Sequence, residues 1–135
     1  MGGEIMKNRG VVFFVLVLVL LGFPAASYAN KSSVKIEAPQ AAEKGSEVVI
    51  KIHVFHKGNN FLHYTDWVDV KINGKPVQRW EFSSSKRPED ENFTREVTYK
   101  LTEPITIVAE ANCNTHGSEG PATWTVTLAP EENEP

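Results

Sequence analysis

Residues 66–82 of this 135-residue chain read DWVDVKINGKPVQRWEF. Aliphatic and polar residues alternate from Val68 to Ile72, which is typical of a strand with one buried face and one solvated face. Asn73-Gly74 follows at once, and both residues tolerate the positive φ that a type I′ turn requires. The stretch therefore predicts a β-hairpin whose second strand returns over residues 76–82.

Similar short runs lie on both sides of this hairpin, and the alternation is clearest from Val48 to Val54. No stretch has the length and period of a substantial helix. The predicted strands are Ser33–Ala38, Glu47–Phe55, Asp66–Ile72, Pro76–Phe82, Asn92–Leu101, Ile105–Asn112 and Ala122–Leu128. This number and spacing of strands predict an all-β fold, a seven-stranded immunoglobulin-like antiparallel β-sandwich.

Residues 1–29 have the composition of a secretory signal peptide. The basic segment Met6–Arg9 precedes an apolar run, Val11–Phe23, that falls short of the ~20 residues needed to span a bilayer. Ser27–Ala29 then places small residues where a signal peptidase cuts. We predict cleavage after Ala29 and an exported, periplasmic or other extracytoplasmic location. The alternative is a membrane anchor formed by an uncleaved signal.

The remainder of the chain has the size of one domain, residues 30–128, followed by a flexible acidic tail at 129–135. The whole chain carries a formal net charge of −3. It shows no cluster of basic residues of the kind that binds nucleic acid.

The single cysteine, Cys113, cannot form an intramolecular disulfide, and a lone exported thiol is a liability unless something occupies it. All histidines and this cysteine fall in two segments, His53–His63 and Cys113–His116. A Cys-x-x-His pair lets a thiolate and an imidazole reach one ion from a tight turn. One thiolate among several imidazoles favours iron or copper over structural zinc. A buried inert thiol, an intermolecular disulfide and ordinary surface histidines remain alternatives.

Three segments carry a specific resemblance: His63-Tyr-Thr-Asp-Trp67, Val68–Lys75 and Cys113-Asn-Thr-His-Gly117. Together they make residues 30–128 similar to the iron domain of superoxide reductases, the desulfoferrodoxin and neelaredoxin family. The resemblance implies a seven-stranded immunoglobulin-like sandwich that holds one non-haem iron through four equatorial histidine nitrogens and one axial cysteine sulfur. It also implies that the open sixth position binds superoxide, which ferrous iron reduces to hydrogen peroxide.

By the same resemblance, Cys113 is the axial ligand, and His56, His63 and His116 are equatorial ligands. Lys31 stands where the family has a lysine near the iron, and a cation there would steer an anionic substrate. Lys31 is therefore the candidate catalytic residue, and an ordinary solvated lysine is the alternative.

The chain departs from the family pattern at its N-terminal motif. The family's Glu-Lys-His-Val-Pro corresponds here to Asn30-Lys31-Ser32-Ser33-Val34, so the glutamate and the fourth histidine are absent. His56 is followed by lysine rather than proline and stands seven residues before His63 instead of six. His53 is a candidate substitute ligand, although three residues along a strand would place it and His56 on opposite faces.

The sequence thus predicts an exported superoxide reductase-like iron protein. Its electrons would come from a separate donor protein, because a rubredoxin-like domain needs four cysteines and this chain has one. A homo-oligomer is compatible with the resemblance. One alternative function is non-catalytic metal binding or electron transfer with iron or copper, although both methionines lie in the predicted signal and cannot serve as axial copper ligands. Another is a carrier domain that has lost its metal.

Overall fold

The computed structural model describes residues 30–132, and all of their regular structure is β-strand. The strands are β1 (Ser33–Glu37), β2 (Ala41–Ala42), β3 (Glu47–Phe55), β4 (Thr65–Ile72), β5 (Lys75–Glu81), β6 (Phe93–Lys100), β7 (Ile105–Cys113) and β8 (Ala122–Leu128). The predicted signal peptide and the end of the predicted tail, residues 133–135, lie outside the described residues. Within residues 30–132 no helix is long and apolar enough to cross a membrane.

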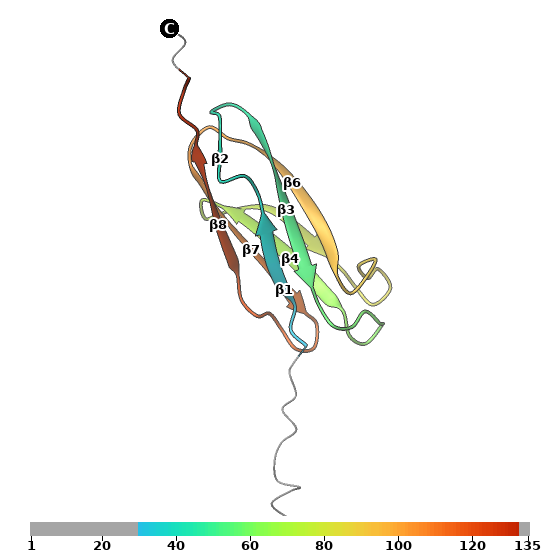
Figure 1. Cartoon of the computed structure of the whole chain (residues 1–135). Coiled ribbons are helices and arrows are strands. Elements are labelled where there is room, and N and C mark those ends of the chain that lie inside the picture. The colour runs from blue at the N-terminus through green and yellow to red at the C-terminus, as the bar shows by residue number, and fades with distance from the viewer. Residues whose placement is uncertain (1–29, 133–135) are drawn as a thin grey trace, which may run out of the picture.

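The strands form two sheets that pack face to face (Figure 1). One sheet has the order β1-β3-β6 and the other the order β2-β8-β7-β4-β5. This confirms the predicted all-β sandwich, and each predicted strand agrees with an observed one to within one residue at either end.

The count of seven strands is wrong by one, because β2 was not predicted. It comprises two residues, too few to show any alternation, and its pairing with β8 is parallel, whereas the other paired strands are antiparallel. Its position depends on the main chain of β8, so no local pattern could indicate it.

The alternating aliphatic residues form the core between the sheets. Ile50 and Ile52 of β3 are fully buried, as are Val68 and Val70 of β4. The residues between them face outward, since successive side chains of a strand point to opposite faces. At the hairpin, Asn73 and Gly74 have φ values of 50° and 78°, as the predicted type I′ turn requires.

The hairpin turn and the two histidine- and cysteine-bearing segments lie at opposite ends of the sandwich. At the end away from the hairpin, β3 finishes, β4 begins and β7 finishes, so the loops that follow or precede them gather there (Figure 1). The segment before β1 joins them, because Ser32 N–H donates to the Gly117 carbonyl at 3.2 Å and Glu119 N–H donates to the Ser32 carbonyl at 3.0 Å. Four separate parts of the chain therefore meet at one end of the sandwich.

Candidate metal centre

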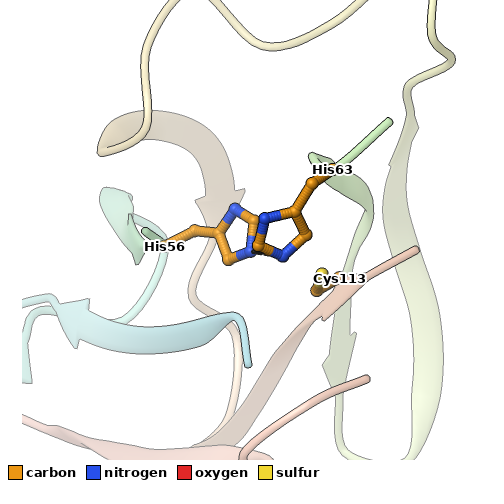
Figure 2. Close-up of side chains that lie close together, drawn as sticks. All are labelled: His56, His63 and Cys113. Atoms are coloured by element: carbon orange, nitrogen blue, oxygen red, sulfur yellow. Dashed lines mark hydrogen bonds between the residues drawn. The ribbon is translucent and has the colours of Figure 1, made fainter. Parts of the chain in front are cut away.

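Three of the predicted ligands converge at this end of the sandwich. Potential ligand atoms of His56, His63 and Cys113 all lie within 4.8 Å of one another. Figure 2 shows the two imidazole rings meeting from opposite sides, with the Cys113 sulfur beside them. His116 joins this group from the turn after β7: its Nδ1 is 3.0 Å from His63 Nε2 and 3.9 Å from Cys113 Sγ.

The imidazole nitrogens form a continuous run centred on His63. His63 Nε2 lies 3.2 Å from His56 Nε2 as well as 3.0 Å from His116 Nδ1, and both ring pairs meet edge to face. A neutral imidazole has one protonated nitrogen and one nitrogen with a free lone pair, so each of these rings can offer a lone pair to the centre. Such a set of nitrogens suits a cation held among them.

Cys113 is the last residue of β7 and only 1% exposed. The turn after it is closed by two main-chain hydrogen bonds between Cys113 and Gly117, and Gly117 has φ +84°. Within this turn the His116 N–H donates to Cys113 Sγ at 3.4 Å. A hydrogen bond of this kind stabilises a thiolate, which is the form that binds a metal.

Asn114 joins this turn to the loop that carries His63. Its side chain accepts a hydrogen bond from Tyr64 N–H at 3.0 Å and donates to the Leu62 carbonyl at 3.1 Å, and its N–H donates to the Tyr64 carbonyl at 3.0 Å. Sequence analysis gave Asn114 no role, although it lies within the Cys-Asn-x-His-Gly run that carried the resemblance. It is a positioning residue that fixes the distance between the loops of His63 and His116.

Gly58 is a second positioning residue that sequence analysis missed. It has φ +122°, and a Cβ at this position would lie 2.5 Å from His63 Nδ1. The backbone of the loop thus passes directly against the His63 ring. Only glycine leaves room for the ring in its present orientation.

His56 is 5% exposed, and its own N–H donates to the Asn92 side chain at 3.2 Å. Burial, and after it the proximity of His63, lowers the pKa of His56. The imidazole is consequently neutral near pH 7, and a neutral imidazole is the form that can donate a lone pair to a metal.

The structure does not bring His53 to the group. Its Nδ1 is 2.9 Å from Thr94 Oγ1 and its Nε2 is 2.6 Å from Glu37 Oε2, so both ring nitrogens already have partners on the outer face of the three-stranded sheet. The hydrogen bond from His53 also lowers the pKa of Glu37. The hypothesis that His53 replaces the missing family histidine is therefore not supported.

Ser32, at the position of the missing histidine, is completely buried. Its hydroxyl is 2.8 Å from the hydroxyl of Thr65, so the two polar groups satisfy each other. Lys31 is exposed and lines a cleft of about 580 Å³ together with His56 and Lys57. The structure thus places the candidate catalytic lysine on the cleft beside one candidate ligand.

These residues fit a transition metal. Three imidazoles and one cysteine sulfur suit iron or copper, and the sulfur accepts a hydrogen bond from His116 N–H within the same turn. A family model described as desulfoferrodoxin matches residues 25–119. The chain belongs to the desulfoferrodoxin family.

Solved structures similar to this desulfoferrodoxin-family protein support the same fold. A superoxide reductase (neelaredoxin) from Ignicoccus hospitalis is 22% identical, with a TM-score of 0.59 over 79% of this chain and 89% of its own. A putative superoxide reductase from Thermotoga maritima is 24% identical, with a TM-score of 0.55 over 73% of this chain and 86% of its own.

A third similar structure has a different name. The CARDB domain of a Pyrococcus furiosus protein, in complex with di-metal ions, is 19% identical, with a TM-score of 0.57 over 76% of this chain and 97% of its own. No curated protein matches the sequence. At these identities the structural matches establish the sandwich fold, while the family model establishes membership of a family that binds non-haem iron.

Proposed function

We propose that this protein is an exported non-haem iron oxidoreductase that reduces superoxide to hydrogen peroxide. The observation that carries the proposal is the convergence of the His56, His63 and His116 nitrogens with the Cys113 sulfur in a desulfoferrodoxin-family chain. Export follows from the predicted signal peptide.

Ferrous iron, when bound by these residues, would supply the one electron that superoxide takes up on its conversion, with two protons, to hydrogen peroxide. The Cys113 thiolate is an electron-rich donor, and its hydrogen bond from His116 N–H tunes how much charge it gives to a metal. Burial of Cys113 and His56 keeps water away from two of the ligands. The exposed side of His116 leaves the centre accessible to a small anion.

The cleft beside His56 offers a route for that anion. Lys31 and Lys57 line it together with Glu91 and Glu119, and a lysine beside the centre attracts an anionic substrate at short range. We therefore expect Lys31→Gln to lower the second-order rate of superoxide-driven oxidation several-fold at low ionic strength and by less at high salt.

Lys44→Gln is the matched control for Lys31→Gln, because Lys44 is also exposed but lines a separate pocket formed with the residues that follow β8. Stopped-flow absorption at several salt concentrations measures both variants. Equal rates for the two would show that Lys31 is an ordinary solvated lysine.

The electron that regenerates the ferrous form must come from a separate donor protein. The cysteine of this sequence, Cys113, belongs to the candidate metal centre, which supports a donor on another protein. We propose that this donor is a redox protein in the compartment to which the chain is exported.

The test is to load the protein with ferrous iron without oxygen and to mix it with superoxide. We expect one iron per chain, rapid loss of the ferrous form and one hydrogen peroxide for each superoxide consumed. Elemental analysis, stopped-flow absorption and a peroxide assay give the three quantities.

A second candidate function is metal binding or electron transfer without catalysis. The observation that favours it is the Ser32–Thr65 pair, which stands where the family has a fourth imidazole. Bound iron that superoxide fails to oxidise, or selective binding of copper, would support this candidate and contradict the reductase.

A further inference from the structure

We propose that the main-chain carbonyl oxygen of Asn30 is a further donor to the metal centre, in place of the histidine that this chain lacks. The inference rests on the proposed metal binding but not on any reaction with superoxide. Its starting point is the 3.0 Å distance between the Asn30 carbonyl oxygen and His56 Nε2, the atom that lies 3.2 Å from His63 Nε2.

The Asn30 oxygen extends the run of nitrogens by one member. From the Asn30 oxygen to His56 Nε2, His63 Nε2 and His116 Nδ1, the successive distances are 3.0, 3.2 and 3.0 Å. Nitrogen and oxygen ligands lie about 2.1 Å from a first-row metal, so two donors at right angles around one ion are about 3 Å apart. The three successive distances therefore match the spacing of adjacent donors around one ion.

The chain holds this carbonyl in place through its neighbour Ser32. Ser32 is tied to the turn after β7 by hydrogen bonds to Gly117 and Glu119, and its buried hydroxyl is tied to Thr65 at the start of β4. The hydroxyl of Ser32 is thus directed to Thr65. With that side chain occupied elsewhere, the main chain of Asn30 is what reaches His56.

The chemistry of a carbonyl oxygen suits this role. Without metal, His56 Nε2–H donates its hydrogen bond to the Asn30 oxygen. A metal that binds His56 Nε2 takes the place of that proton, which leaves the oxygen lone pair free to bind the same ion. A carbonyl is a neutral donor, like the imidazole it would replace, and oxygen ligands are accepted by Fe(II).

The decisive experiment is a crystal structure of the full chain loaded with Fe(II) without oxygen. We expect the Asn30 carbonyl oxygen about 2.0–2.3 Å from the iron, within the range for metal–oxygen bonds. An oxygen that stays more than about 3 Å from a bound iron, with water or an empty position in its place, would overturn the inference while leaving the proposed function intact.

A solution measurement uses the unique Asn30–Lys31 peptide. No other asparagine in the chain precedes a lysine, so [1-¹³C]Asn with [¹⁵N]Lys labels one coupled carbonyl. Titration with Zn(II) should shift this signal until one equivalent is bound. The Asn73–Gly74 carbonyl, labelled with [¹⁵N]Gly, is the control at the far end of the sandwich and should not move. An Asn30 carbonyl signal that stays unchanged at saturation would overturn the inference.

The variant Asn30→Ala tests whether the main-chain carbonyl or the side-chain amide of Asn30 binds the metal. Because alanine keeps the carbonyl, we expect its Fe(II) affinity to stay within twofold of the unaltered protein. His56→Ala removes the neighbouring nitrogen and should lower the affinity at least tenfold. A tenfold loss in Asn30→Ala would assign the donor to the side-chain amide and refute the main-chain ligand. A protein that binds no metal at all would refute this inference together with the proposed function.

Discussion

Replacement of Cys113 by serine is expected to remove the thiolate-to-iron absorption band and to lower Fe(II) affinity by about 100-fold or more, since loss of supporting residues around metal ligands alone costs about 10–100-fold. The sulfur is buried, lies within 4.8 Å of His56 and His63 ligand atoms and accepts a hydrogen bond from His116 N–H. Serine is a poor anionic donor at neutral pH, so the variant would lack the negatively charged ligand. Visible absorption and metal titration measure the two effects.

The control for this variant is Ala111→Ser. Ala111 is the previous inward-facing residue of β7 and is also fully buried, so the substitution adds a buried hydroxyl on the same strand face. Such a hydroxyl costs about 1–3 kcal/mol when unpaired. We expect Ala111→Ser to be less stable but to keep the absorption band. An intact band in Cys113→Ser would show that Cys113 is an inert core thiol.

Gly58→Ala is expected to give the second-largest effect. The new Cβ would lie 2.5 Å from His63 Nδ1, so the ring must rotate, and its Nε2 would leave the point where it meets the nitrogens of His56 and His116. We expect Fe(II) affinity to fall on the order of 10–100-fold, the effect typical of residues that orient a ligand. Competition titration against a chelator measures the affinity.

Gly45→Ala is the control for Gly58→Ala, because it introduces backbone strain without displacing the His63 ring. Gly45 has φ +89°, and a Cβ there meets nothing within 4 Å. Both variants place alanine at positive φ, which costs about 1–3 kcal/mol of stability. Only Gly58→Ala should lose iron. Similar affinities in the two variants would mean that the His63 ring adapts and that Gly58 does not position it.

The contrast between His53 and His56 shows how far sequence reasoning reached into the site. Alternation along β3 correctly separated the two residues, because the face of a strand is a local property. Both histidines lie close to the same strand end, yet one pairs with Glu37 and Thr94 while the other meets His63. The partners of both histidines come from other segments of the chain, so the sequence of β3 and its end does not predict them.

Asn30 and Ser32 show more clearly what could not be predicted from the sequence. The sequence showed that a family histidine is missing, but a missing residue does not say what fills its place. The answer depends on hydrogen bonds from Ser32 to Thr65 and Gly117, which are formed only when the chain has closed on itself. The role of Gly58 could not be predicted from the sequence either, because it depends on the His63 ring lying close to the backbone at this glycine.

By itself the sequence determined the two-layer β architecture and the Asn73-Gly74 turn, which depend on period-two alternation and on turn chemistry. The four residues to be tested as ligands came from the resemblance of short motifs to the superoxide reductase family. All of these are properties of short segments. The tertiary structure alone decided which donors meet. His63 and His116 are 53 residues apart in the chain, so their contact depends on the packing of two loops against each other. Asn114, Gly58 and the segment before β1 fix that packing, and they act through space rather than along the chain.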